Sequence, residues 1–588
     1  MGQRGTITGA AMYNTLRTLI APGNRVRLSP FVESAQFQVL FGQVPETSRR
    51  FEDSNRILNE CRESVTKWAE ALNEFRSTGG CLGANVYSQD FLSVYLAYYF
   101  TTNVCKVQLV LLELARRGWL SGDLSVVDMG VGTGTTAVAV LDFLAAWNVT
   151  GNLYSRPFPV TGVELCGYDA NPHSLNSARA VTLAYADAID ERRKQRGSEF
   201  LDILSNAART SVWKKWDLVR ETPVLSKSPS LLVASNILNE LVNAPGAGHK
   251  HLADLIKALS PGSLSIVLEP GDARRTRILN AWRCSVVDGA NQIQSLLPCG
   301  SEFGDSLPSA CSGCWNARRE HMHPSPLYNM FRQEAARKAG DQRTWDVFEN
   351  GLLSWSYTVL GSSVRHPNEE IRNRLTAQGE SISGTVRHIG MFRGMDEQPH
   401  DMPHAQAPDE IVNHAYHDFI KFCPGEMARY NLPGLILKRP VGFDIGRIDH
   451  GTLLELHGAR FRTERQAGRL DIPPGNPDVP AVSLASVPVE AESNRGGFLE
   501  RYHHISQTAV DEIAYRLFGF DGMRQFQHEI LSRSLTGKNI FGIAATGGGK
   551  SECYILPAML LPGVTIVVSP LKSLMQDQYF QRIVDRYG

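Results

Sequence analysis

The chain has 588 residues, 43% of them hydrophobic, which is enough for about three or four domains with real cores. Lys plus Arg and Asp plus Glu balance at 60 each, so net charge predicts no partner and any nucleic-acid surface must be a local patch. No apolar run approaches the roughly 18 residues that span a membrane, no signal peptide is evident, and ten cysteines in so long a chain exclude a disulfide scaffold. We therefore expect a cytoplasmic protein in which clustered cysteines indicate metal binding or catalysis.

Residues 1–120 are predicted to form a helical N-terminal region. Apolar residues recur on one helical face over 49–75, and a second, aromatic-rich helix is predicted over 87–118. The expected role of both stretches is to pack against the domain that follows.

Residues 121–300 begin with a glycine loop between a predicted strand and a predicted helix. Gly130, Gly132 and Gly134 follow the strand, and this spacing lets the backbone approach a ligand closely. No Lys follows the last glycine, so the loop suits a dinucleotide or S-adenosylmethionine (SAM) rather than a triphosphate. With Asp128 at the strand end, the loop resembles motif I of class I methyltransferases, which favours SAM. The carboxylate of Asp169, after the next strand, is expected to bind the ribose hydroxyls.

Strands and helices continue to alternate beyond this loop. Strands are predicted over 230–236 and 263–268, and a helix begins at 239–241. The alternation predicts a doubly wound, Rossmann-like sheet, with a fold that has lost its cofactor as the alternative. The N/D-P-P-Y/F signature of amino-group methyltransferases is absent, so base methylation is unsupported and SAM binding without methyl transfer stays open.

A narrower resemblance covers about residues 85–460. The segments Asn239-Glu240-Leu241 and Leu268-Glu269-Pro270-Gly271 are similar to those of methyltransferase-like proteins that assist small-ribosomal-subunit assembly in mitochondria and bacteria. The resemblance implies that this module contacts ribosomal RNA, with DNA as the alternative partner.

Residues 301–460 are predicted to hold a cysteine-containing insertion and the C-terminal part of the same module. Cys311 and Cys314 can turn two thiolates toward one metal, Cys299 adds a third, and the distant Cys423 is the expected fourth. Four thiolates suit Zn²⁺ or a [4Fe–4S] cluster, and unliganded thiols are the alternative. The ribosome-assembly resemblance favours the cluster, although the His and the second Cys-Pro usual in those relatives are missing here.

Two polar stretches separate this module from the end of the chain. Residues 375–410, rich in Gly, His, Met and Pro, are predicted to form a long loop. Residues 471–497 are rich in Pro, Ser and Val and predict a linker.

Residues 511–588 contain a second glycine loop, Thr546-Gly547-Gly548-Gly549-Lys550-Ser551, preceded by a predicted buried strand over 540–544. Glycines let backbone N–H groups surround phosphate oxygens at the start of the next helix. Lys550 is expected to reach the β- and γ-phosphates and Ser551 to ligate Mg²⁺, which predicts binding of ATP with Mg²⁺.

Segments on both sides of this loop complete the pattern. Arg524 and Gln527 precede it, and Ser569-Pro570-Leu571 to Gln578 follows it. Together these resemble the RecQ family of superfamily-2 DNA helicases, with Met523 in the position where the family usually has Phe. The resemblance implies that Arg524 and Gln527 read adenine and that Ser569, Pro570 and Gln578 follow the nucleic-acid track.

The sequence ends soon after this last motif, without the acidic box or the second RecA-like lobe that phosphoryl transfer needs. We therefore expect a front piece of a longer protein that binds nucleotide without hydrolysing it alone. The predicted fold class is multidomain α/β: a helical N-terminal region, a Rossmann-like methyltransferase sheet with a cysteine-rich metal insertion, and an incomplete RecA-like lobe. The predicted function is a nucleic-acid-acting fusion of a SAM-binding module with a 3′–5′ helicase. The alternative is a non-catalytic ribosome- or RNA-binding assembly factor that carries a helicase remnant.

Overall fold

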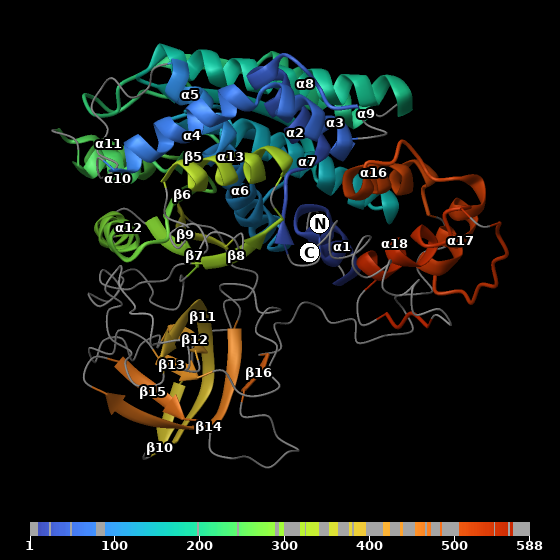
Figure 1. Cartoon of the computed structure of the whole chain (residues 1–588). Coiled ribbons are helices and arrows are strands. Elements are labelled where there is room, and N and C mark those ends of the chain that lie inside the picture. The colour runs from blue at the N-terminus through green and yellow to red at the C-terminus, as the bar shows by residue number, and fades with distance from the viewer. Residues whose placement is uncertain are drawn as a thin grey trace. The chain divides into compact units, whose positions relative to one another are not determined.

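The computed structural model divides into two compact units, each considered separately (Figure 1). The first unit comprises Met1–Asp217, Glu320–Leu353 and Val489–Gly588, and the second comprises Leu218–Arg319 and Ser354–Pro488. The structure describes residues 10–22, 25–46, 50–77, 89–196, 199–243, 246–287, 293–298, 318–323, 325–339, 352–362, 505–545, 547–561 and 565–568, and the backbone alone of the strands between 375 and 484.

Helices make up the N-terminal part of the first unit, as predicted. They are α1 (Ala10–Ile20), α2 (Pro30–Phe41), α3 (Arg50–Glu60), α4 (Arg62–Ser77), α5 (Gln89–Ala97) and α6 (Tyr99–Arg116). The two long helices expected from the periodicity are each divided in two, by a turn at Cys61 and by a turn at Tyr98. Nearly every residue of α6 is buried, so this helix is a core element rather than a surface cover.

A parallel ladder forms the centre of the first unit. β2 (Gly122–Met129) pairs with β3 (Val160–Asp169), which pairs with β4 (Val212–Lys215), and both pairings are parallel. The crossover from β2 to β3 is α7 (Thr135–Leu153), and α8 (Pro172–Arg196) with α9 (Glu199–Arg209) leads on to β4. Parallel strands joined by helices are the arrangement that the strand–helix alternation predicted.

The second unit holds a further parallel pair, extended by antiparallel strands. β5 (Leu231–Ser235) runs parallel to β6 (Leu264–Pro270), and β9 (Leu352–Ser362) runs antiparallel to β6 and to β7 (Ile293–Leu297). The helices here are α10 (Leu238–Asn243), α11 (Gly248–Lys257) and α12 (Ala273–Val286). The fold is therefore mixed α/β and rich in parallel strands.

The second unit also contains a seven-stranded sheet (Figure 1). Its strands are β10 (Leu375–Gln378), β11 (Ser381–Met395), β12 (Tyr416–Cys423), β13 (Leu435–Lys438), β14 (Leu453–Glu464), β15 (Ala467–Asp471) and β16 (Val482–Leu484). The long loop predicted over 375–410 is wrong, because β10 and β11 occupy 375–378 and 381–395 and pair with each other and with β12. Composition misled the prediction, since strand pairing is decided by partners distant in sequence. β16 lies inside the stretch predicted as a linker and pairs with β14.

The C-terminal residues of the first unit form α16 (Gln507–Phe518), α17 (Gln525–Leu535) and α18 (Glu552–Leu560). The buried strand predicted over 540–544 is wrong, because this stretch is extended but unpaired and Phe541 is 91% exposed. Val568 in the described stretch 565–568 is similarly 89% exposed. A strand is stable only when neighbouring strands take its hydrogen bonds, and the described residues pair none with either stretch.

Among the described residues, no helix is both long and apolar enough to cross a lipid bilayer.

Candidate functional site

The first glycine loop has the backbone that its sequence predicts. Gly130, Gly132 and Gly134 all have positive φ angles, of 75°, 52° and 79°, which favour glycine. A Cβ atom on Gly132 would meet nothing within 4 Å, so the space beside it is open to a ligand. A Cβ on Gly134 would lie 2.8 Å from the Cα atom of Ala178, so this glycine lets α7 and α8 pack closely.

Asp169 lies at the end of β3, directly beside this loop. One carboxylate oxygen accepts the N–H of Gly132 at 3.1 Å, and the other accepts the N–H of Asn171 at 2.8 Å. Burial raises the pKa of Asp169, and these two backbone donors oppose the rise. The structure therefore brings the predicted ribose-binding acid to the predicted glycine loop.

Asp128 lies beneath the loop rather than on its open side. Its side chain is buried, and burial raises its pKa to about 7, while the Thr136 hydroxyl opposes the rise. Cys166 and Trp213 line the same small void in the core. Neither oxygen of Asp128 makes a hydrogen bond of good geometry among the described residues, so this acid is a buried core group.

Glu269 is a buried acid of the second unit that the sequence reasoning did not select as a site residue. Its Oε1 atom accepts the N–H groups of Leu238 at 2.8 Å and Asn239 at 3.4 Å, at the start of α10. Burial raises its pKa to about 8, against the effect of those N–H groups. Asn236, which precedes α10, has a positive φ of 60°, a conformation that is uncommon outside glycine. An acid at the carboxyl end of a parallel strand was the signal that could have identified Glu269.

The second glycine loop and the predicted adenine-binding residues meet in the structure. The Gln527 side chain accepts the N–H of Arg524 at 2.8 Å and donates to the carbonyl of Gly549 at 2.8 Å. The Lys550 ammonium donates to the carbonyls of Ala544 at 2.9 Å and Ala545 at 3.0 Å. Arg524, Gln527 and the loop residues 547–550 thus form one cluster, while Thr546 lies outside the described residues.

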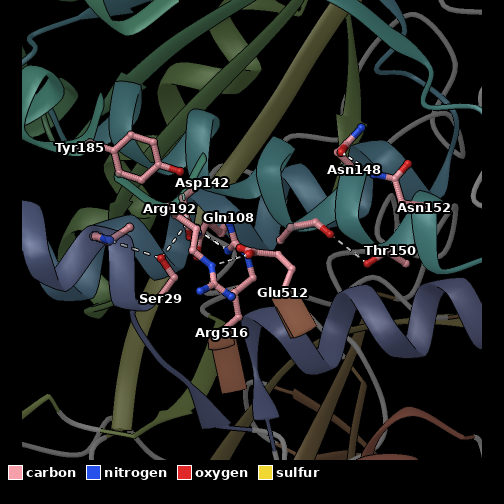
Figure 2. A network of polar contacts seen from close by, with 12 residues as sticks. Ser29, Gln108, Asp142, Asn148, Thr150, Asn152, Tyr185, Arg192, Glu512 and Arg516 are labelled. Carbon is pink, nitrogen blue, oxygen red and sulfur yellow. Dashed lines mark hydrogen bonds and ion pairs between the residues drawn. The ribbon is translucent and has the colours of Figure 1, made fainter. Parts of the chain in front are cut away.

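Helix α16, which precedes this cluster, is anchored in the core of the first unit (Figure 2). Arg516, 1% exposed, pairs with Asp142 of α7 at 3.1 Å, and Arg192 of α8 donates to Glu512 at 3.0 Å. The Asp142 carboxylate also accepts the Ser29 hydroxyl at 2.7 Å and the Gln108 amide at 2.8 Å. Each charge in this network lies beside an opposite charge, while Nη2 of Arg516 and Oε1 of Glu512 have no hydrogen-bond partner among the described residues. The pairing of charge is therefore complete, and the hydrogen bonding that a buried ion pair also needs is only partly satisfied.

Asp511, the residue before Glu512 in α16, contacts the start of α17. The Asp511 carboxylate accepts the N–H of Met523 at 2.7 Å and pairs with the imidazole of His528 at 3.0 Å. Because Arg524 and Gln527 lie between those two residues, α16 connects the cluster of Arg524, Gln527 and the second loop to the helices that follow the first glycine loop.

The predicted metal site and the predicted nucleic-acid contacts lie almost entirely outside the described residues. Cys299, Cys311 and Cys314 lie outside the described residues, and Cys423 is described only as the last backbone position of β12. In the described part of the chain, no group of three or more His, Cys, Asp or Glu side chains could hold a metal ion. Ser569, Pro570 and Gln578 also lie outside the described residues.

Comparison with known proteins identifies the C-terminal segment. The family model for DEAD/DEAH box helicases matches residues 524–584. The chain is 43% identical over 86 residues to the ATP-dependent DNA helicase RecQ of Pasteurella multocida, a match that covers 14% of this chain and 13% of that protein. It is 41% identical over 100 residues to the ATP-dependent DNA helicase Q-like 2 of Arabidopsis thaliana, covering 17% and 14% respectively. The predicted resemblance to RecQ helicases is confirmed, and the chain spans about one seventh of the length of these relatives.

Solved structures similar to the chain include a SAM-dependent methyltransferase from Geobacter sulfurreducens in complex with S-adenosyl-L-homocysteine. That match has a TM-score of 0.23 and 11% identity, over 44% of this chain and 90% of that one. The [4+2]-cyclase SpnF matches with a TM-score of 0.24 and 15% identity, over 43% and 81%. TM-scores this low carry no argument about the fold. The assignment of a Rossmann-like fold therefore rests on the parallel strands and the glycine loop of this chain.

Proposed function

We propose that this chain combines a SAM-binding, methyltransferase-like part with the nucleotide-binding start of a RecQ-like, ATP-dependent DNA helicase. The observation that carries the proposal is the hydrogen bond from the Gln527 carboxamide to the Gly549 carbonyl, which joins the adenine-reading motif to the phosphate loop. The helicase relatives support DNA as the substrate of this part, and 3′ to 5′ translocation is what the RecQ resemblance implies for a complete motor. The same relatives make a non-catalytic assembly factor the less favoured function.

The second loop suits a nucleoside triphosphate with Mg²⁺. Positive φ angles at Gly547 and Gly549 let the loop turn its N–H groups inward. Ser551 would ligate Mg²⁺. The two carbonyls that now hold Lys550 are neutral acceptors, so charged phosphate oxygens would replace them favourably. Mg²⁺ would then neutralise charge on the β- and γ-phosphates.

Lys550→Ala tests this assignment. We expect binding of a fluorescent ATP analogue with Mg²⁺ to weaken at least about tenfold, because the charge-assisted hydrogen bonds to phosphate are lost. Lys538→Ala is the matched control, since it removes the same charge outside the loop and should leave affinity unchanged. Equal affinity of wild type and Lys550→Ala would contradict the loop assignment.

The first loop suits SAM on its open side. Gly132 would let the methionine part approach the backbone, and Asp169 would hold the ribose hydroxyls. When bound, SAM supplies an activated methyl group, and the proposal includes binding without transfer. Titration calorimetry with SAM should show at least about a tenfold loss in Asp169→Ala through loss of the ribose contacts. Asp123→Ala, at the opposite end of β2, should bind like wild type, and an unchanged Asp169→Ala would contradict the site.

A separate proposal concerns the cysteines. Cys299, Cys311, Cys314 and Cys423 would hold a [4Fe–4S] cluster, with Zn²⁺ as the alternative. Iron, sulfide and zinc analysis of protein purified without oxygen tests this, repeated on Cys311→Ser. We expect the metal to be lost in the variant, and metal content that is absent from both proteins or equal in both contradicts the site.

A further inference from the structure

Five strands of the seven-stranded sheet form a closed ring. β11 pairs with β12, β12 with β13, β13 with β15, and β15 with β14. β14 then pairs back to β11, so the path returns to its start. A sheet that closes in this way is a small β-barrel. Figure 1 shows its curved strands gathered in one group.

The order of strands around the ring identifies the type of barrel. Counted along the chain, the order is first, second, third, fifth, fourth, and back to the first. The third and fifth strands, β13 and β15, are parallel, while every other pair in the ring is antiparallel. This is the arrangement of the oligonucleotide/oligosaccharide-binding (OB) barrel, a five-stranded Greek-key barrel.

The first strand of the ring also has the form that this barrel requires. The second half of β11 pairs with β12, and its first half pairs with β14. The register shifts between His388 and Gly390 on one side and between Ile382 and Gly384 on the other. Such irregularities bend a strand, which lets a single strand close both sides of a barrel.

The register divides the strand residues into two faces. One face is mainly apolar, and its opposed positions include Ile420 with Leu437, Phe422 with Leu435, and Phe461 with Leu470. Arg393 and Asp418 share this face but lie directly opposite each other, so their charges balance. Hydrophobic burial makes this apolar face the one suited to the barrel interior.

The other face is basic and aromatic. Phe392, Phe419 and Lys438 form one row across three strands. The next row runs through all five strands of the ring, as Gly390, Lys421, Ile436, Arg469 and Arg462. The basic residues of this face are Arg387, Lys421, Lys438, Arg460, Arg462 and Arg469, against the acidic residues Glu455, Glu464 and Asp471.

We propose that strands β11 to β15 form an OB-type barrel that binds single-stranded nucleic acid across the face carried by β11, β12 and β13. OB barrels bind their ligands over the second and third strands, which are β12 and β13 here. Bases stack on aromatic rings without sequence preference, and cationic side chains follow the backbone. The excess of basic over acidic residues favours the polyanionic strand over an oligosaccharide. Its residues are distinct from those of both glycine loops, so the proposal does not rest on nucleotide binding.

The test is anisotropy of the full chain with a labelled oligothymidylate of about 20 nucleotides, long enough for one OB barrel. We expect Phe419→Ala to weaken binding by about 5- to 150-fold, the range for losing one stacked base. Lys421→Gln and Lys438→Gln should each lower the slope of log affinity against log salt by about 0.7. Lys257→Gln on α11 is the control and should change neither quantity.

The outcomes separate the alternatives. Circular dichroism and thermal melting establish which variants fold, and the two lysine variants decide the test if Phe419→Ala does not fold. Unchanged affinity and salt slope in both lysine variants would overturn the proposal, as would wild-type protein that does not bind the oligonucleotide. Binding of a neutral oligosaccharide in place of the oligonucleotide would also overturn it.

Discussion

The two glycine loops of this chain follow the same local plan but are built differently. The first follows β2, a strand that is paired with β3 and has a buried end. The second follows residues 540–545, which no described strand pairs and of which Phe541 and Ile543 are 91% and 87% exposed. The turn and the following helix form in both places, whereas the strand forms only where it has a neighbour.

Local and long-range hydrogen bonding explain the difference. A helix satisfies its own backbone groups, so α17 and α18 form on either side of the second loop. A strand depends on partners that come from elsewhere in the chain. The second loop is held instead by α16, whose buried network ties it to α7 and α8, the helices that follow the first loop.

The largest effect is expected from disrupting the buried network that connects α16 to α7 and α8. Asp142→Ala removes the nearer of the two carboxylates beside the buried guanidinium of Arg516, the one that it hydrogen-bonds, which should cost about 3–5 kcal/mol of unfolding free energy. Urea denaturation measures the loss. Arg56→Ala is the control: it removes the exposed ion pairs to Asp53 and Glu60, which solvent screens, and should leave the unfolding free energy almost unchanged. A loss below about 1 kcal/mol in Asp142→Ala would mean that the network does not anchor α16.

One matched pair of glycine substitutions compares the loops directly. Gly134→Ala and Gly547→Ala both place a side chain at positive φ, 79° and 75°, which costs about 1–2 kcal/mol each. Only at Gly134 does the new Cβ also press on the α8 backbone, which should add about 1–3 kcal/mol. Thermal unfolding of the two variants measures the difference, and equal losses would contradict the close packing of α7 on α8.

The pH dependence of folding stability should reveal the buried Asp128 next to the first glycine loop. Its folded pKa of about 7 lies above the ordinary value of 3.8, so the folded state binds more protons between those values. Stability should therefore fall as pH rises from about 4 to 7, by up to about 1.4 kcal/mol per pH unit. Asp128→Asn should flatten this part of the stability–pH curve. If the stability–pH curve of Asp128→Asn has the same slope as that of the wild type, the pH dependence comes from other titratable groups and the prediction for Asp128 is wrong.

The smallest effect should come from Cys553, which lies one turn beyond the second loop. Burial raises the pKa of its thiol to about 11, so it should stay protonated and unreactive at neutral pH. Alkylation by iodoacetamide at pH 7 should be slow and should not change nucleotide affinity. Rapid modification together with loss of ATP-analogue binding would contradict this expectation.

Much of both loops could be predicted from sequence because the relevant geometry is local. The glycines at 130, 132 and 134 predicted a turn with positive φ angles, and the structure has them. Asp169 follows the next parallel strand, so it was expected to lie beside that turn, and it accepts the N–H of Gly132. The RecQ resemblance implied that Arg524 and Gln527 act next to the second loop, and in the structure Gln527 donates to the Gly549 carbonyl.

The remaining features were decided by the tertiary structure, since they join residues distant in sequence. In the sequence, nothing links Asp142 to Arg516, which lie on different helices far apart in the chain. The packing of α16 brings them together as an ion pair. β11 lies in the stretch 375–410, which had the composition of a loop, but pairing with β12 and β14 makes residues 381–395 a strand. The sequence by itself determined the turns, the helices and the ligand chemistry of the loops, because those depend on neighbouring residues. Strand pairing, barrel closure and the burial of charge depend on which distant segments meet, so only the folded chain could decide them.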